Sequence, residues 1–247
     1  MSDPIAVPST SAPTGSEMST AETLTGIFFE PSRTFESLRA RPRFLVAGII
    51  LLVVACLVTA LIYMRVDMGQ MIRDRIEQSP RAANLTEDQK EMQVRMGKSL
   101  GAVIVPVSVP IVFAGGAALY LLLGMAFGGT INYKQSLSVW VYSSLPQHLL
   151  GAVIAVLVLF LKSPESIQPE RMVATNPAVF LGEDSSRVLI ALLSQFDLLK
   201  FYGLFLAALG LRKVAKLSST QAWGVVLCLW FIGLLLAVGF AALGAGR

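Results

Sequence analysis

Apolar residues gather into long runs along this chain, and polar segments separate the runs. A helix needs about 20 apolar residues to cross a hydrocarbon core about 30 Å thick. Several runs meet that length without a charge, and one further run contains charged side chains. The pattern predicts an all-α, polytopic membrane helix bundle with about five transmembrane helices, which we place at about 44–64, 99–127, 137–161, 198–213 and 221–243.

The start of the chain has a different composition. Residues 1–22 are rich in Ser, Thr, Pro and Ala, and they contain neither an apolar core nor a basic flank before one. These features argue against a signal peptide and predict a disordered cytoplasmic tail. We therefore divide the chain into a tail over 1–22 and one transmembrane domain over 23–247.

The fourth run is the informative one, because the apolar stretch 188–211 contains Asp197 and Lys200. If the stretch is one continuous crossing helix, both charges lie inside the membrane, at a cost of about 2.5–3.5 kcal/mol each on insertion scales. Alternatively, residues 187–196 form a short interfacial helix, and Asp197 caps a span over 198–213 with Lys200 reaching the headgroups. We favour the second arrangement and keep the first as the alternative.

A polar segment over 65–98 has positive and negative charges nearly in balance. Apolar side chains recur at helical spacing in its first half, and Thr86 with Gln89 forms a capping-box pattern for a helix that continues into the second span. The segment therefore predicts an extramembrane helical hairpin. A second polar loop, of irregular structure, is predicted over 162–187.

The composition agrees with a membrane protein, because 54% of the residues are hydrophobic, 15% are charged and the mean hydropathy is +0.66. The formal net charge is +4, but the basic residues flank the apolar runs, so membrane orientation explains them and we predict no nucleic-acid partner. Basic residues in short loops on one side predict a cytoplasmic N-terminus and an outside C-terminus. They are Arg33, Arg39, Arg41, Arg43, Lys134, Arg212, Lys213 and Lys216.

Sequence motifs for cofactor or metal chemistry are absent, including a P-loop, a dinucleotide glycine fingerprint, an HExxH zinc site and a paired-cysteine metal site. The single histidine, His148, has Ser144 at helical spacing, but no glycine-framed nucleophile turn accompanies the pair. An intramembrane aspartyl protease needs two carboxylates, and the spans offer Asp197 alone. We therefore predict no enzyme activity, no metal and no cofactor.

Polar side chains nevertheless occur inside the third and fourth spans. Ionisable groups within a membrane often mark the path of a substrate or an ion, so these residues are candidates for a transport path. Hydrogen bonding between the helices is the alternative, and we favour it. The candidates are Tyr142, His148, Asp197 and Lys200, together with Gln135, Ser138, Gln147 and Ser194.

Small residues at four-residue spacing predict close helix contacts. Gly124 and Gly128 form a GxxxG pair, and Gly233 with Ala237 forms a second small-residue pair. Such pairs serve packing within a chain as well as dimerisation. We favour packing within the chain and keep a homo-oligomer as the alternative.

Three segments, taken in their order along the chain, carry a resemblance to a known family. They are Phe28-Phe29-Glu30-Pro31 with Phe35 before an arginine-rich stretch; Gly128-Gly129-Thr130-Ile131-Asn132-Tyr133-Lys134-Gln135-Ser136-Leu137 leading to Tyr142-Ser143-Ser144-Leu145-Pro146; and Phe196-Asp197 before an apolar run that ends at Gly210-Leu211 and a basic turn. In these segments the chain resembles the Yip family of Ypt/Rab-interacting membrane proteins, and specifically its bacterial branch, from about Leu24 to the C-terminus.

This resemblance implies five spans, a cytoplasmic N-terminus, an outside C-terminus and a non-enzymatic role. The Asp-Leu-Tyr-Gly-Pro motif of the Rab-binding branch has no counterpart before Phe44, so the resemblance does not imply a Rab partner. We expect a scaffold or adaptor for membrane organisation or trafficking in a bacterial inner membrane, with protein partners besides the lipid bilayer. The alternative is a small transporter or channel with a polar path between the third and fourth helices.

Overall fold

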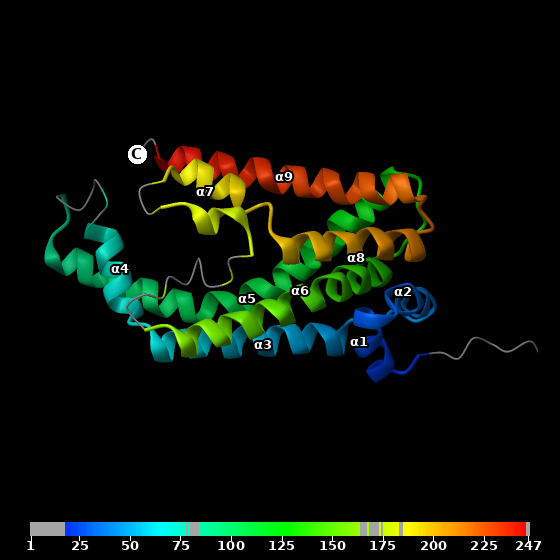
Figure 1. The fold of residues 1–247 in the computed structure, drawn as a ribbon, viewed down its shortest axis with the longest axis horizontal. Coiled ribbons are helices and arrows are strands. Elements are labelled where there is room, and N and C mark those ends of the chain that lie inside the picture. The colour runs from blue at the N-terminus through cyan, green and yellow to red at the C-terminus, as the bar shows by residue number, and fades with distance from the viewer. Residues whose placement is uncertain are drawn as a thin grey trace, which may run out of the picture.

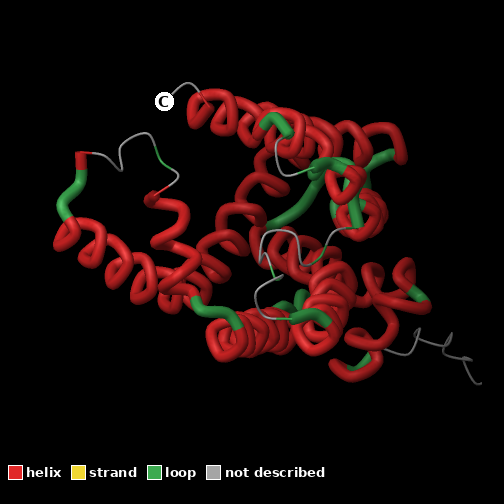
Figure 2. The backbone as a smooth tube through the Cα atoms, turned by 60° about the vertical axis from the view of Figure 1, so that its left-hand side comes forward, coloured by secondary structure: helices red, strands yellow, loops and turns green. Residues whose placement is uncertain are grey.

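The computed structural model describes residues 18–77, 79, 84–163, 167, 173, 175–182 and 185–245. All regular structure in those residues is helical, and none of it is β-strand (Figure 2). This confirms the predicted all-α class. Most of the predicted tail, residues 1–17, and much of the predicted loop over 162–187 lie outside the described residues.

Four helices of the described chain are each long and apolar enough to cross a membrane. They coincide with the first, second, third and fifth predicted spans. In lipid an uncharged run of this length forms a helix because a helix satisfies its own backbone hydrogen bonds. Their bounds are α3 Leu45–Arg65, α5 Glu87–Ala126, α6 Tyr133–Leu161 and α9 Ser219–Ala245.

The fourth predicted span, 198–213, corresponds to one helix of a bent pair. α7 Arg187–Leu193 and α8 Leu198–Val214 meet at 46° across a short break. Counted as one span, the pair brings the candidate membrane spans of the described chain to five.

α6 lies at the centre of the bundle, in contact with α3, α5 and α8. α8 also contacts α9, and α7 packs against α9 as well (Figure 1). The described chain begins at one end of the bundle, beside α1 and α2, and it finishes at the opposite end, where α4 also lies (Figure 1). The two ends of the described chain lie at opposite ends of the bundle because the chain runs along the bundle an odd number of times.

Two short helices that the sequence analysis does not predict precede the first span. α1 Thr20–Phe29 begins at a capping box between Ser19 and Glu22, and α2 Pro31–Ala40 begins with a proline. Residues 20–22, predicted as part of the disordered tail, are therefore helical. Both helices pack against α6, and α2 also packs against α8.

The α1–α2 pair contributes large side chains to the core. Ile27, Phe35 and Leu38 are fully buried although they precede the first span. Phe35 lies against Gly210 of α8, where an added Cβ atom would be 2.8 Å from the Phe35 ring and 2.8 Å from Val139 of α6. Because Gly210 has no side chain, α2, α6 and α8 can approach one another closely at this point.

The segment predicted as an extramembrane hairpin forms two packed helices. α4 Met68–Glu77 contacts the N-terminal part of α5, where Ile72 lies against Gly97. α5 begins at the predicted capping box, in which the Thr86 and Gln89 side chains each accept the other residue's backbone N–H. The first turns of α5 thus extend a helix that continues into the second span.

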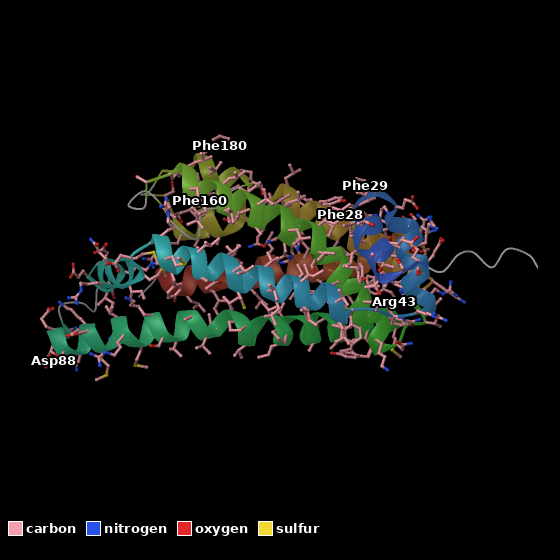
Figure 3. The ribbon with its side chains drawn as sticks, turned by 90° about the horizontal axis from the view of Figure 1, so that it is seen from below. Phe28, Phe29, Arg43, Asp88, Phe160 and Phe180 are labelled. Carbon is pink, nitrogen blue, oxygen red and sulfur yellow. The ribbon has the colours of Figure 1, made fainter. Side chains whose placement is uncertain are left out.

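Charged groups gather at the two ends of the molecule, and carbon dominates between them (Figure 3). Arg43 marks the end with α1 and α2, which we call the basic end, and Asp88 marks the opposite end, which we call the hairpin end (Figure 3). At the basic end Gln135 Nε2 donates to the Arg39 carbonyl oxygen at 2.9 Å, which ties α6 to the residues before α3. The predicted cytoplasmic set of arginines and lysines lies on the elements that meet here.

The predicted small-residue pairs have different surroundings. Gly128 has a φ of +88° and follows the end of α5, and the Gly129 N–H donates to the Gly124 carbonyl oxygen at 2.8 Å. This left-handed geometry favours glycine and ends the helix, so Gly128 is a helix terminator. An added Cβ atom at Gly233 meets no described atom within 4 Å, because this position faces away from the bundle. At Gly128 an added Cβ atom would lie 3.7 Å from the Gln221 side chain of α9, whereas Gly233 has no such neighbour among the described residues.

Candidate functional site

The break between α7 and α8 is built around Asp197. Its Oδ1 atom accepts a hydrogen bond from the Lys200 backbone N–H at 3.1 Å, which makes Asp197 the N-cap of α8. A carboxylate is favourable at this position because the helix N-terminus carries a partial positive charge. The predicted cap is present, and α8 begins at the predicted residue, Leu198.

The break lies level with the middle of the neighbouring helices. The Trp230 indole N–H of α9 donates to the Gln195 carbonyl oxygen at 3.3 Å, and Trp230 is close to the centre of Ser219–Ala245. On the other side, Gly203 of α8 lies against the Gln147 amide, at the centre of α6. α7, predicted as an interfacial helix, packs against α9. The helix is interrupted, as in the favoured prediction, yet the interruption is at mid-length of the bundle.

Aromatic side chains fill the bend between the two helices. The ring of Phe196 lies 5.6 Å from that of Trp230 in an edge-on arrangement, and the ring of Phe201 lies 6.1 Å from Trp230. An edge-on ring pair such as Phe196 with Trp230 stabilises by about 0.5–1.5 kcal/mol beyond its buried area. This cluster holds α7 and the start of α8 to the centre of α9.

The second oxygen of Asp197 binds the loop that precedes the 3₁₀ helix η4 Pro177–Phe180. Asp197 Oδ2 accepts hydrogen bonds from Thr175 Oγ1 at 2.6 Å and from Asn176 Nδ2 at 3.4 Å. The Thr175 carbonyl in turn accepts the Leu198 N–H at 3.1 Å, and Asn176 caps the 3₁₀ helix Pro177–Phe180. The carboxylate thus has several protein donors, and it joins the loop to α8.

Lys200 has fewer partners than Asp197. Its ammonium donates to Gln195 Oε1 at 2.8 Å, and within the described part of the chain no carboxylate oxygen lies within ion-pair distance of it. An ammonium has three N–H donors, so two of them are left for water or a ligand. The predicted place of this side chain is at the headgroups; in the structure it is half-buried beside Gln147.

His148 is one turn along α6 from Ser144, and its Nδ1 atom lies 2.7 Å from the Ser144 carbonyl oxygen. A carbonyl oxygen only accepts, so Nδ1 carries the hydrogen in this bond. In the neutral imidazole the Nε2 atom is then an acceptor. The bond fixes the ring orientation without using Nε2.

These polar groups meet at one cavity of about 480 Å³. Its size falls within the range of about 300–1,000 Å³ that is usual for small-molecule sites. On the α6 side the cavity is lined by small residues, which leave space for it: Gly151, Ala152 and Ala155. The other lining residues are Leu51, Val54, Ala55, Val58 and Thr59 of α3, Val105 of α5, Gln147 and His148 of α6, Val173, Asp197, and Leu199 and Lys200 of α8.

A smaller cavity of about 110 Å³ adjoins the first toward the basic end. Gln147 and Lys200 line both cavities, so this pair of side chains forms the partition between them. Ser143 and Ser144 line the small cavity, together with the packed Tyr120 and Trp140 rings, whose centroids are 4.8 Å apart.

The structure brings Gln147, His148, Asp197 and Lys200 together, and it places the other candidates elsewhere. Tyr142 is buried in the core near the basic end, where its hydroxyl group lies 3.1 Å from Thr23 Oγ1 of α1. Ser138 donates to the Lys134 carbonyl and Ser194 donates to the Ile190 carbonyl, both within their own helix turn. Gln135 belongs to the capping box of α6 and donates to the Arg39 carbonyl at the basic end.

Sequence reasoning did not identify Thr175, Asn176 or Gln195 as parts of the site. Asn176 precedes Pro177, and an Asn-Pro pair is a turn signal that could have marked it as a cap. Thr175 and Gln195 carry no local signal, because their partners are defined by the bend. No group of three or more potential metal ligands occurs within the described residues, and Cys56 and Cys228 are free thiols.

Comparison with known proteins identifies a family for the chain. No curated protein matches it, and no solved structure matches it. The family model of the Yip1 domain matches residues 25–240, which includes α2, the first four candidate spans and most of α9. The chain is therefore a membrane protein that belongs to the Yip1 domain family.

Proposed function

We propose that this Yip1-domain protein is a non-enzymatic membrane scaffold or adaptor that binds a protein partner through the hairpin of α4 and α5. α5 has 40 residues, so at 1.5 Å per residue it is about 60 Å long. A hydrocarbon core is about 30 Å thick. About half of α5 is therefore free to extend from the membrane and carry α4 with it.

A pair of exposed methionines on this extension is the observation that carries the proposal. Met92 and Met96 are one turn apart on α5, with side chains 62% and 56% exposed, and Glu91 and Arg95 lie beside them. The charged neighbours favour water at this level, so lipid does not account for the exposed apolar surface. Methionine adapts its shape to a partner surface, and it is frequent at protein-binding sites. The exposed apolar surface of this pair continues toward the membrane with Leu100, one turn further along α5.

The arrangement of charges supports an orientation for the adaptor. Basic residues in short connections favour the cytoplasmic side of a membrane. The basic end then faces the cytoplasm with the N-terminus, and the hairpin end and the C-terminus face outward. In a bacterial inner membrane, the partner of the hairpin is accordingly an outward-facing protein or the outer part of another membrane protein.

Site-specific photocrosslinking tests this proposal. A photoreactive amino acid at Met92 or Met96 in intact cells is expected to give one crosslinked species of defined mass, while the same group at the exposed neighbour Gln93 gives much less. Met92→Glu with Met96→Glu is expected to abolish co-purification of that partner, and Gln93→Glu is not. Failure of both methionine positions to crosslink, in a protein that is correctly inserted, contradicts the proposal. A crosslinked dimer identifies a second copy as the partner.

Transport is the second candidate function, and the position of the helix break favours it. Transporters often place polar binding sites near the middle of the membrane, at the ends of discontinuous helices. Here the N-terminus of α8, Gln147 and Lys200 meet at mid-length of the bundle. A small transporter or channel predicts that Asp197→Asn abolishes flux in reconstituted vesicles. Flux equal to that of the unaltered protein removes Asp197 from such a mechanism.

A further inference from the structure

The cavity between α3, α5, α6 and α8 has two chemically distinct parts. One side carries Gln147, His148, Asp197 and Lys200, and the rest of the wall is mostly aliphatic. The aliphatic part includes Val54 and Val58 of α3. A ligand that satisfies both parts must have a polar head and an apolar body, because burying polar groups against the aliphatic wall costs free energy.

The charges in the cavity differ in how well the protein satisfies them. Asp197 accepts hydrogen bonds from Thr175, Asn176 and the Lys200 backbone, so the loop and α8 supply the donors that its carboxylate needs. The Lys200 ammonium has one described acceptor, Gln195 Oε1. Because cations within a membrane bundle require partners, the incompletely paired group is the positive one. Among the described residues the Asp197 carboxylate is already occupied by donors, so the acceptor that is missing is one for the Lys200 ammonium.

We propose that this cavity binds a single-chain amphiphile with an anionic head, with the head at Lys200 and the chain along α3 and α6. The Gln147 amide, beside Lys200, can donate a second hydrogen bond to the head. The aliphatic residues bury the chain, and each buried CH₂ group contributes to affinity. This inference concerns the cavity of the second candidate function, but binding does not require flux, and it is independent of the hairpin.

Binding of radiolabelled laurate to the full chain in phosphatidylcholine nanodiscs tests the proposal. Empty nanodiscs give the background from partition into lipid. Unlabelled laurate is expected to displace the label, whereas dodecanol, which has the chain without the charge, and acetate, which has the charge without the chain, compete at least about tenfold more weakly. Equal competition by acetate overturns the proposal in favour of a small-anion site. Equal competition by dodecanol overturns it in favour of an apolar cavity.

Two pairs of variants locate the bound molecule. Lys200→Gln removes the charge and is expected to weaken laurate binding at least about tenfold, as loss of a charge-assisted hydrogen bond does. Lys134→Gln makes the same change at the exposed start of α6 and is expected to have no effect. Ala152→Phe fills the cavity without changing a charge and is expected to abolish binding. Val153→Phe adds the same ring at an exposed position one residue along and is expected to retain it.

The outcome does not depend on one variant. If Lys200→Gln does not fold, Lys200→Arg keeps the charge and is expected to retain binding, and Ala152→Phe against Val153→Phe decides the location. Laurate binding that is unchanged by Ala152→Phe, or no saturable binding above empty nanodiscs, overturns the proposal. Either result leaves the crosslinking test of the hairpin unaffected, so failure of the cavity and failure of the adaptor function are distinguishable.

Discussion

The Trp230 indole N–H donates a hydrogen bond to the Gln195 carbonyl oxygen at 3.3 Å. This contact joins the centre of α9 to the last residues before α8, so the depth of Trp230 in the membrane reports the depth of the helix break. Trp223 lies seven residues earlier on α9, which corresponds to about 10 Å along the helix axis toward the basic end.

We expect Trp230 to lie deeper in the bilayer than Trp223. Two single-tryptophan proteins share Trp140→Phe, and one adds Trp223→Phe while the other adds Trp230→Phe. In lipids brominated at different chain positions, Trp230 fluorescence is expected to be quenched most by bromine near the bilayer centre, and Trp223 fluorescence by bromine nearer the headgroups. The reverse order would place the break, and Asp197 with it, at a membrane boundary.

A side chain at position 210 is expected to destabilise the basic end. In Gly210→Ala the new methyl group meets the Phe35 ring and Val139, each at 2.8 Å, so packed neighbours must move. Overpacking of this kind typically costs about 1–3 kcal/mol. We expect the free energy of unfolding in detergent micelles to fall by about that amount, and Phe35→Leu in the same protein to restore part of it.

Gly115→Ala is the matched control, because an added Cβ atom there meets nothing within 4 Å. Alanine is a better helix former than glycine by about 1 kcal/mol, so this variant is expected to be neutral or more stable. If the two alanine variants lose stability equally, contact with Phe35 is not the cause.

The spans could be predicted from sequence because hydropathy and helix length depend on local composition. The Thr86 and Asp197 caps were predictable for the same reason, since each is a residue type with a preferred position at the start of a helix. The depth of the Asp197 break was not predictable in this way. It depends on Trp230 and on the contact of α7 with α9, which lie on different helices.

The helices α1 and α2 show a second limit on what could be predicted from the sequence. The Ser19 and Glu22 capping box is a local signal for α1, and α1 was missed although this signal is present in the sequence. Docking of α2, in contrast, has no local signal. It depends on the fit between Phe35 and Gly210, which are 175 positions apart, and a single sequence does not reveal that contact.

The contact between Thr23 and Tyr142 predicts which of two substitutions lowers the stability more. The Thr23 hydroxyl donates to the Thr20 carbonyl oxygen at 2.8 Å, so in the 3.1 Å contact the Tyr142 hydroxyl is the donor. Tyr142→Phe removes the donor and leaves Thr23 bonded, at a cost of about 1 kcal/mol. Thr23→Val leaves the buried Tyr142 hydroxyl without its acceptor, which costs about 1–3 kcal/mol.

We therefore expect Thr23→Val to lower the free energy of unfolding more than Tyr142→Phe does, and the double variant to cost less than the sum of the two. Laurate binding is expected to be unchanged in Tyr142→Phe, because Tyr142 does not line either cavity. Strictly additive losses would show that the two hydroxyl groups are not coupled.

Asp67 makes the attachment of the hairpin sensitive to acid. The Gln70 and Gly69 backbone N–H groups donate to its Oδ1 atom at 3.1 and 2.9 Å, and these bonds lower the pKa of the carboxyl group below its ordinary value, with a smaller contribution from Lys98. A carboxylate whose pKa is lowered by folding stabilises the folded state at all pH values above its unfolded pKa of about 4. That stabilisation is lost as the pH falls through the lower pKa of the folded state.

The first turn of α4 is consequently expected to fray as the pH falls below about 4, while it stays intact at neutral pH. The amide chemical shifts of Gly69 and Gln70, followed by NMR in detergent micelles, measure this transition at the two donors. Asp67→Asn is the matched control, since an asparagine side chain still caps a helix but does not titrate in this range. In that variant both amide shifts are expected to be independent of pH between 2 and 7. A transition of the same midpoint and amplitude in Asp67→Asn would assign the titration to another group.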